Sequence, residues 1–330
     1  MKIGIAGLGF MGATHIGAMQ KIPGLELGAV CTTNERALSG DLTDVGGNLD
    51  IPGAKYDFSA VHKCREWQEL VADPDLEAID ICLPTDLHAQ VAIRALESGK
   101  HVLCEKPMAL NTDDCSRMIR AARNAGRVLM IGQVLRFWPE YATLREAIES
   151  ERFGIVRSVE FRRSAGLPDW SRWLPREERS GGAVVDLLVH DIDQAIALFG
   201  MPETVSARSL GAVDTIDAAL SYTNGVEVRI KGGWLAPGEK FSMGFEMVAE
   251  HGTLRLDGTG LTFTDESGTQ PVRTEEGDGY QRELAYFAEC CRRNLKPDRC
   301  PPEQSAQGIA LALVLKESRK REGHTLRCSA

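Results

Sequence analysis

The sequence has 330 residues, of which 43% are hydrophobic and 26% are charged. These proportions are those of an ordinary globular protein, and they exclude collagen-like, low-complexity and disordered chains. At ~150 residues per domain, the length predicts about two domains. The net charge of −9 leaves no polybasic footprint, so we expect no nucleic-acid partner. The apolar stretch at 308–315 is far shorter than the ~20 residues of a membrane span, so we expect no membrane association.

The first residues form a short apolar run that leads directly into a glycine-rich pattern. They lack the cationic region and the long apolar region of a signal peptide. The nine cysteines include no C-x-x-C pair, and most lie in apolar strand or helix patterns. This usage predicts reduced thiols in the core of a cytoplasmic protein.

Short apolar runs alternate with helical patterns in the first third of the chain. Strands are predicted at residues 2–6, 25–31, 78–83, 101–104 and 128–133, helices at 11–21, 87–98 and 113–125, and the end of another helix at 67–71. Alternation of short buried strands with helices predicts an α/β fold with a doubly wound parallel sheet. We assign residues 1–125 to a Rossmann domain.

The pattern changes beyond about Leu135. A strand is predicted at 155–163, a strongly apolar helix at about 182–199, and two closing helices at about 280–294 and 303–320. Between them, residues 226–231 and 240–247 alternate apolar and polar side chains, which predicts antiparallel strands with one buried face. We assign residues 126–330 to a second domain.

A glycine-rich loop lies between the first predicted strand and the first predicted helix. It reads G-x-G-x-x-G over residues 7–12. The first glycine allows a tight turn, the second lets backbone approach a pyrophosphate, and the third lets the helix pack closely. The helix N-terminus attracts the phosphates. The alternative is a purely structural turn, but this context favours a dinucleotide site made by Gly7, Gly9, Phe10, Met11 and Gly12.

The second strand ends without the acid that holds the ribose 2′-hydroxyl in many NAD-binding domains. Thr32 and Thr33 follow it and can donate to a 2′-phosphate, and Arg36 is near enough to help. Glu35 favours NAD but lies past the predicted strand end. These residues favour NADP, although they also suit the cap of a following helix, and the choice between NAD and NADP stays open.

Glu105-Lys106-Pro107 directly follows the predicted strand 101–104. This is the carboxyl end of a parallel strand, where such sheets bind their ligands. A lysine at this place can donate a hydrogen bond to a substrate oxygen as hydride moves. The alternative for this tripeptide is an ordinary solvated turn.

Asp186 and His190 lie four residues apart in the predicted apolar helix, so they would share one face, with Asp193 close to it. An acid beside an imidazole orients the ring and stabilises its cation, as a general acid or base requires. Charged groups among apolar neighbours must be paired or functional. The alternatives are a satisfied pair or a metal site, but no third ligand is evident from the spacing, and we predict no metal.

Together these motifs resemble the glucose–fructose oxidoreductase and inositol 2-dehydrogenase family of NAD(P)-dependent sugar and polyol dehydrogenases. The resemblance rests on the 7–12 loop, Pro84-Thr85-Asp86-Leu87-His88, the run from Gly99 to Pro107, Arg136-Phe137-x-Pro139, and the run from Gly181-Gly182 to His190. It covers residues 2 to about 200. The chain departs from the family at Ala183, where a third glycine is usual, and at Thr32, where an aspartate is usual.

The resemblance implies a Rossmann domain and a C-terminal α/β domain whose open, mostly antiparallel sheet often forms homodimers or homotetramers. It implies a catalytic set of Lys106, Asp186 and His190. It places Pro84, Thr85 and His88 on the nicotinamide side, with Glu105 nearby, and Lys106 is expected to contact the cofactor as well. The implied reaction transfers hydride between NAD(P) and a hydroxyl or carbonyl of a sugar, cyclitol or related small polar molecule.

Arg136, Trp170 and Trp173 are the candidate substrate contacts. The two tryptophans lie in a polar, aromatic loop, and an aromatic face suits a sugar ring, although packing in the core is the alternative. Five other histidines lack comparable context and are expected to be structural or at the surface: His15, His62, His101, His251 and His324.

Two other functions stay open. One is a glycosidase of the same family that uses bound NAD for transient oxidation and shows no net cofactor turnover. The other is a catalytically silent regulator that binds a dinucleotide or a sugar. Such a regulator would be expected to have degraded catalytic positions, and the presence of Lys106, Asp186 and His190 weighs against it.

Overall fold

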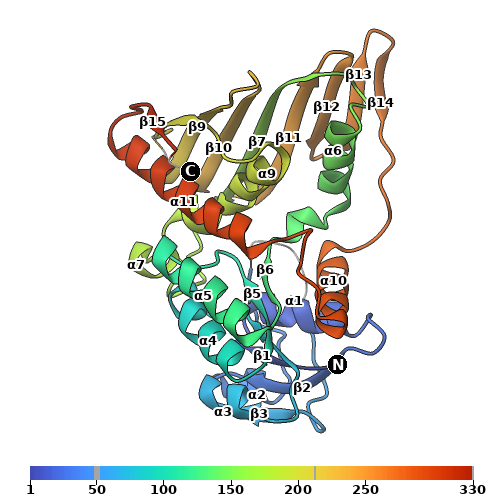
Figure 1. The fold of residues 1–330 in the computed structure, drawn as a ribbon, viewed down its shortest axis with the longest axis vertical. Coiled ribbons are helices and arrows are strands. Elements are labelled where there is room, and N and C mark those ends of the chain that lie inside the picture. Colours follow the sequence, from blue (N-terminus) through green and yellow to red (C-terminus); the bar gives the residue numbers. More distant parts are fainter. Residues whose placement is uncertain (48–52, 212, 329–330) are drawn as a thin grey trace. The chain divides into compact units, whose positions relative to one another are not determined.

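The computed structural model describes residues 1–47, 53–211 and 213–328, which form two compact units (Figure 1). Unit 1 comprises Met1–Val134 and Gly277–Ala306, and unit 2 comprises Leu135–Glu276 and Gln307–Ala330. The sequence analysis placed one boundary at 125/126, before the last strand of the first sheet. It also did not foresee that a segment near the end of the chain returns to unit 1, where α10 (Gly279–Arg293) packs on α1 (Phe10–Met19).

Unit 1 is built on a six-stranded, fully parallel sheet with the order β3-β2-β1-β4-β5-β6. The strands are β1 (Lys2–Ala6), β2 (Glu26–Cys31), β3 (His62–Cys64), β4 (Ala78–Ile81), β5 (His101–Glu105) and β6 (Leu129–Gly132). The four residues of β4 and the five of β5 are all buried, as expected for strands covered on both faces. The predicted doubly wound parallel sheet is confirmed.

The helices of unit 1 follow the strands in the expected alternation. Besides α1 and α10 they are α2 (Glu35–Leu38), α3 (Trp67–Ala72), α4 (Thr85–Glu97) and α5 (Thr112–Ala125). Local sequence sets their ends: the Asn111 side chain accepts the Asp114 N–H at the start of α5, and Gly126 ends this helix in the left-handed conformation.

Unit 2 is built on a nine-stranded sheet with the order β14-β13-β12-β11-β7-β10-β9-β8-β15. Its strands are β7 (Val156–Gly166), β8 (Thr204–Arg208), β9 (Asp214–Ser221), β10 (Glu227–Leu235), β11 (Ser242–Ala249), β12 (Gly252–Asp257), β13 (Gly260–Asp265), β14 (Gly268–Pro271) and β15 (Leu326–Arg327). Only β7 and β10 pair in parallel; the other neighbours are antiparallel. The prediction of a mostly antiparallel second sheet is confirmed.

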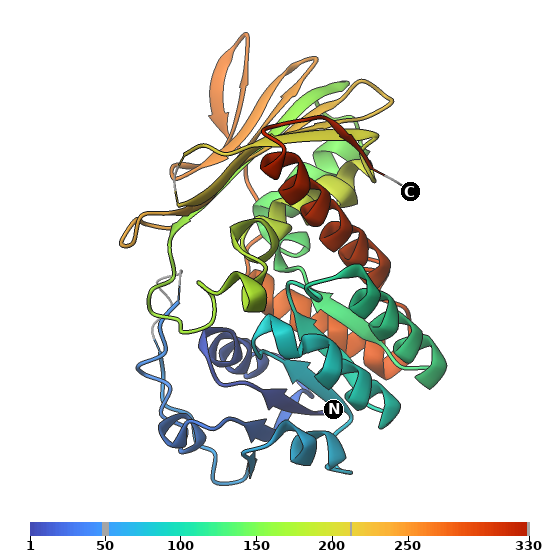
Figure 2. The same ribbon diagram turned by 90° about the vertical axis from the view of Figure 1, so that its left-hand side faces the viewer.

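One face of this sheet carries the helices of unit 2, as Figure 2 shows. They are α6 (Pro139–Glu149), α8 (Ala183–Asp186), α9 (Val189–Phe199) and the part of α11 (Pro302–Lys320) beyond Ala306, and the one-turn helix α7 (Glu177–Ser180) precedes α8. The ring of Tyr141 in α6 packs edge-on against Phe245 of β11, with 5.3 Å between centroids. In β10, buried Val228 and Ile230 alternate with exposed Glu227 and Arg229, so the opposite face is polar.

Two buried ion pairs fix α9 within unit 2. Arg163 of β7 donates from Nε and Nη2 to the carboxylate of Asp191, at 2.8 and 3.1 Å. Arg136, at the end of the short 3-10 helix Val134–Arg136, donates from Nε and Nη2 to Asp193, both at 2.7 Å. All four side chains are at most 3% exposed. A buried carboxylate of this kind depends on its partner to offset the loss of hydration.

The described residues contain no helix that is long and apolar enough to cross a membrane. All nine cysteines are free thiols, and seven of them are buried.

Arg163→Met is expected to lower the free energy of unfolding by about 3–5 kcal/mol, because it leaves the buried Asp191 carboxylate unpaired. The exposed pair Arg229–Asp217 gives the matched control, and Arg229→Met is expected to cost less than about 1 kcal/mol. Urea unfolding of the variants measures both values. The double variant Arg163→Met/Asp191→Leu should recover most of the loss, and equal costs for the two single variants would contradict this account.

Candidate active site

The glycine loop after β1 has the geometry of a phosphate-binding turn. Gly7 has a φ of +97°, and a Cβ there would lie 2.4 Å from the Cys82 carbonyl oxygen. A Cβ on Gly12 would lie 2.1 Å from the Gly7 carbonyl oxygen, so α1 packs directly on the loop. A Cβ on Gly9, in contrast, would meet no atom of the described chain within 4 Å. The space beside Gly9 is therefore open to a ligand.

The start of α1 suits an anion. Gly9 is the N-cap residue, and the cap has no side-chain hydrogen bond. The first turn of α1, which the structure describes completely, contains no acidic residue. Phe10 and Met11 open the helix and are half-buried. Helix N–H groups and the helix dipole attract negative charge, so the loop fits the pyrophosphate of a dinucleotide.

The residues after β2 are engaged with their own surroundings. The Thr32 hydroxyl oxygen accepts the Asn34 N–H at 3.2 Å, and Thr33 is exposed. The Asn34 side chain in turn accepts the N–H groups of Arg36 and Ala37 at the start of α2. The helix cap that the sequence analysis kept as an alternative is therefore present, and it is made by Asn34.

The Arg36 side chain, predicted to help bind a 2′-phosphate, is held by a small acidic loop. Its Nε lies 3.2 Å from Asp41, its Nη1 forms an ion pair with Asp44, and its Nη2 donates to the Thr43 hydroxyl at 2.8 Å. The guanidinium is thus surrounded by two carboxylates. A 2′-phosphate would have to displace them or bind beside their negative charge.

The loop after β4 forms the start of α4. Pro84 is the N-cap residue and Thr85 the first residue of the helix, and Thr85 is 2% exposed. His88 is buried, and its two ring nitrogens lie 2.8 Å from the carbonyl oxygens of Leu83 and Pro107. Burial lowers the pKa of His88, although these carbonyls act in the opposite direction. His88 therefore links the loops after β4 and β5.

Lys106 follows directly after β5. Glu105, the last residue of that strand, is buried and accepts the Lys106 backbone N–H with Oε2 at 3.1 Å. The other oxygen, Oε1, lies 3.2 Å from Nε2 of His15. His15 was expected to be a structural or surface histidine, and its contact with Glu105 was not predicted because the two residues are far apart in the sequence.

The sheet order brings these segments together. β1, β4 and β5 are adjacent, so the 7–12 loop, the residues 84–88 and the pair Glu105-Lys106 all leave the carboxyl edge of neighbouring strands. In open α/β sheets, this edge is where ligands bind. Unit 1 therefore presents the glycine loop and a lysine on the same edge of the sheet, with the loop after β4 between them.

In unit 2, Asp186 and His190 are not on one helix, which corrects the sequence prediction. Asp186 is the last residue of α8, and His190 is the second residue of α9. Between them the Leu188 N–H reaches back five residues to the Ala183 carbonyl oxygen, at 2.9 Å, which widens the turn and ends α8. Asp186 therefore ends one helix, and His190 lies in the first turn of the next.

The start of α8 is held by side chains from β9 and α11. Asp214 accepts the Ala183 N–H at 2.7 Å and is itself paired with Arg319. Lys316 donates to the Gly181 carbonyl oxygen at 2.7 Å. Asp186 is 7% exposed and His190 is half-buried. Unit 2 thus fixes both ends of the segment that carries these two residues.

The structure gives the three predicted substrate contacts different surroundings. Arg136 is 3% exposed and paired with Asp193, as described above. Trp173 is half-buried, whereas Trp170 is 47% exposed. Trp170 is therefore not packed in the core, which was the alternative for both tryptophans.

Two family models match the chain. Residues 1–133 match the model described as an oxidoreductase family with an NAD-binding Rossmann fold. Residues 141–255 match the model described as the GFO/IDH/MocA C-terminal domain. The chain belongs to the GFO/IDH/MocA oxidoreductase family. Unit 1 is thus the NAD-binding part of an oxidoreductase, and the resemblance seen in the sequence is confirmed.

Similar members of this family are named dehydrogenases and reductases. A 1,5-anhydro-D-fructose reductase of Ensifer adhaerens is 30% identical over 277 residues, which cover 76% of this chain and 81% of that protein. A myo-inositol 2-dehydrogenase of Thermotoga maritima is 28% identical over 348 residues, which cover 97% and 96%. A solved levoglucosan dehydrogenase in complex with NADH shares the fold, with a TM-score of 0.84, 21% identity and coverage of 100% and 99%.

Gly9→Ala is expected to weaken NADH binding by at least about tenfold, or 1.4 kcal/mol, without lowering the unfolding temperature. The reason is that the added methyl group would enter the space for the ligand and touch no described protein atom. Fluorescence titration with NADH and thermal unfolding measure the two effects. Gly12→Ala is the matched variant and should impair both, because its methyl group would collide with the Gly7 carbonyl. Wild-type affinity in Gly9→Ala would show that no cofactor group lies against Gly9.

Proposed function

We propose that this chain is a dehydrogenase that interconverts a hydroxyl and a carbonyl group on a sugar, cyclitol or related small polar molecule. The observation that carries the proposal is His190, a half-buried imidazole on a helix whose adjacent buried acids, Asp191 and Asp193, are both paired with arginines. A titratable ring fixed in this way can exchange a proton with a bound hydroxyl.

The substrate class is supported by the named relatives. They include a 1,5-anhydro-D-fructose reductase, a myo-inositol 2-dehydrogenase and a levoglucosan dehydrogenase, whose named substrates are all polyhydroxylated rings. Trp170 and Trp173 are the proposed contacts to the apolar face of such a ring. We assign Arg136 to positioning α9 rather than to the substrate, because two of its nitrogens donate to Asp193.

The proposed reaction assigns one role to each catalytic residue. In the direction of oxidation, NAD bound at the glycine loop would supply the acceptor for the hydride that leaves the substrate carbon. His190 accepts the hydroxyl proton as the carbonyl forms. Lys106 donates a hydrogen bond to the same oxygen and stabilises its developing negative charge. Asp186 holds His190 or the substrate in place, and reduction follows the reverse steps.

We propose NAD rather than NADP as the preferred cofactor. The sequence analysis favoured NADP on the basis of Thr32, Thr33 and Arg36. The ion pairs of Arg36 with Asp41 and Asp44 support the opposite choice, because its positive charge is already neutralised locally. The predicted homodimer or homotetramer and the cytoplasmic location stay predictions.

His190→Ala and Lys106→Met are each expected to lower kcat by about 10²–10⁴-fold, the usual effect of losing a proton-transfer or charge-stabilising group. Cofactor affinity should stay within about threefold, since neither change removes the glycine loop. Steady-state kinetics on a panel of inositols, anhydrosugars and aldoses measures turnover. His251→Ala, which removes an exposed histidine of unit 2, is the control and should keep full activity. Near-wild-type turnover in both active-site variants would refute the assignment.

The kcat/KM for NAD is expected to exceed that for NADP by at least about tenfold. The variant Asp41→Asn/Asp44→Asn should narrow this ratio, because it frees the Arg36 guanidinium to meet a 2′-phosphate. Arg36→Ala should leave the use of NAD unchanged. The preference is contradicted if the wild-type protein uses NADP better than NAD.

A further inference from the structure

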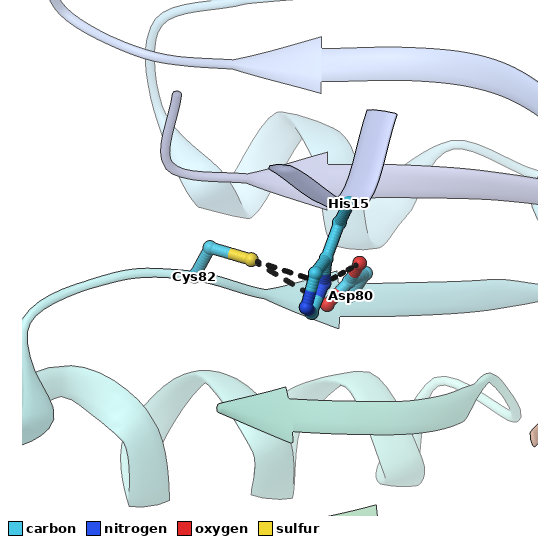
Figure 3. A group of neighbouring side chains, drawn as sticks. All are labelled: His15, Asp80 and Cys82. Carbon is cyan, nitrogen blue, oxygen red and sulfur yellow. Dashed lines mark hydrogen bonds and ion pairs between the residues drawn. The ribbon is translucent and has the colours of Figure 1, made fainter. Parts of the chain in front are cut away.

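A buried polar cluster lies beneath the glycine loop in unit 1, and Figure 3 shows its centre. His15 projects from α1 toward Asp80 of β4, and its Nδ1 lies 2.8 Å from Asp80 Oδ2. On its other side, His15 Nε2 lies 3.2 Å from Glu105 Oε1, as an ion pair rather than an aligned hydrogen bond. The side chains of His15 and Asp80 are fully buried, and that of Glu105 is 7% exposed. Nothing in the proposed catalytic roles uses His15 or Asp80.

The two carboxylates define the charge of the ring. A neutral imidazole has one N–H group and one lone pair, so it can donate to only one carboxylate. His15 has a carboxylate at each nitrogen: Nδ1 is hydrogen-bonded to Asp80, and Nε2 lies 3.2 Å from Glu105 without the alignment of a hydrogen bond. Burial acts to lower the pKa of His15, but the charge of Asp80 and the hydrogen bond to it, with a contribution from Cys82, raise that pKa well above 6.5. The Asp80 carboxylate thus favours the protonated form of the His15 ring.

Two elements contribute the remaining groups around the ring. Cys82 of β4 places its sulfur 3.6 Å from His15 Nδ1, and it also donates to Asp80. From α10, the Tyr280 ring lies 6.1 Å from the His15 ring, and Glu283 is fully buried near His15 and Glu105. These donor atoms are close enough to surround a metal ion. The hydrogen bond between His15 and Asp80 places a proton, not a metal ion, at Nδ1, and the group of Nε2, Glu105 and Glu283 is tested by the metal analysis below.

The cluster reaches the proposed catalytic lysine through Glu105. The carboxylate of Glu105 faces His15 with Oε1 and accepts the Lys106 backbone N–H with Oε2, at 3.1 Å. A shift of the His15 ring would release Glu105, and the carboxylate would then no longer fix the backbone at Lys106. The connection from Asp80 through His15 and Glu105 to Lys106 is continuous, and all of it lies within unit 1.

We propose that His15, held by Asp80, is a positioning residue for Lys106: it fixes the Glu105 carboxylate, and Glu105 fixes the backbone from which the lysine side chain extends. This inference rests on the proposed function of Lys106 in catalysis. Misplacing a catalytic group by about 1 Å can cost up to about 10²-fold in rate. A change in the cluster that displaces Lys106 is therefore expected to lower kcat.

The first test replaces His15 by glutamine, which is similar in size but cannot carry the charge. His15→Gln is expected to lower kcat by about 10–100-fold, with KM and the Kd for NADH changed by less than about threefold. His101→Gln is the matched control. It also removes a buried histidine of unit 1 on the same strand as Glu105, but His101 accepts the Val128 N–H and lies at the other end of β5. It should lower stability and keep kcat.

A double-mutant cycle separates this inference from the proposed function. If His15 acts through Lys106, His15→Gln should cause no further loss of kcat when Lys106 is already methionine. Independent, multiplicative losses would overturn the positioning role. If Lys106→Met alone keeps wild-type turnover, the proposed catalytic role of Lys106 fails instead, and the two failures are thereby distinguished.

A second variant tests the same role with a volume-preserving change, and a spectroscopic measurement tests it without an activity assay. Asp80→Asn preserves volume and should give a smaller loss of kcat than His15→Gln, in the same direction. In protein with ¹⁵N-labelled histidine, the NMR signals of the His15 ring should show two protonated nitrogens at neutral pH. These signals are assigned to His15 because they disappear in His15→Gln. A neutral His15 tautomer would overturn the proposal. So would a stoichiometric metal ion in the purified protein that disappears in His15→Gln.

Discussion

A buried carboxylate must have a cation beside it, and this requirement fixes each segment that carries a proposed catalytic group. In unit 2, Asp191 and Asp193 follow His190 in the first turns of α9, and Arg163 and Arg136 hold them. In unit 1, Asp80 and Glu105 face the two nitrogens of His15. Breaking such a pair leaves a charge that the interior cannot hydrate. Buried ion pairs therefore hold the segments that carry the proposed catalytic groups.

Much of the fold could be predicted from local sequence. Buried strands alternate with helices up to Gly132, the glycine loop has a recognisable spacing, and period-two alternation marks the second sheet. The break between α8 and α9 could not be predicted, because Leu187 and Leu188 continue the apolar pattern through it. The return of residues 277–306 to unit 1 could not be predicted either, because a helical pattern does not indicate which sheet the helix packs on.

The site was only partly accessible from the sequence, because a motif gives residue types but not their partners. The sequence predicts that Arg36 binds a phosphate, but in the structure it is paired with Asp41 and Asp44. Arg136 looks like a substrate contact until Asp193 is found on its guanidinium. His15 has no acid within one helical turn, and its partner Asp80 is 65 residues away. Long-range pairing of this kind decides whether a charged side chain binds ligands or supports those that do.

The central claim is that this chain transfers hydride between NAD and a polyhydroxylated substrate. The most direct test incubates the protein with NADH carrying deuterium at C4 and a panel of ketones and lactones of cyclitols and sugars. Mass spectrometry then follows the label. The account predicts oxidation of NADH with one deuterium transferred to the reduced carbon of the product. Cleavage of a glycoside without net NADH oxidation, or NADH binding with no transfer to any member of the panel, would contradict it.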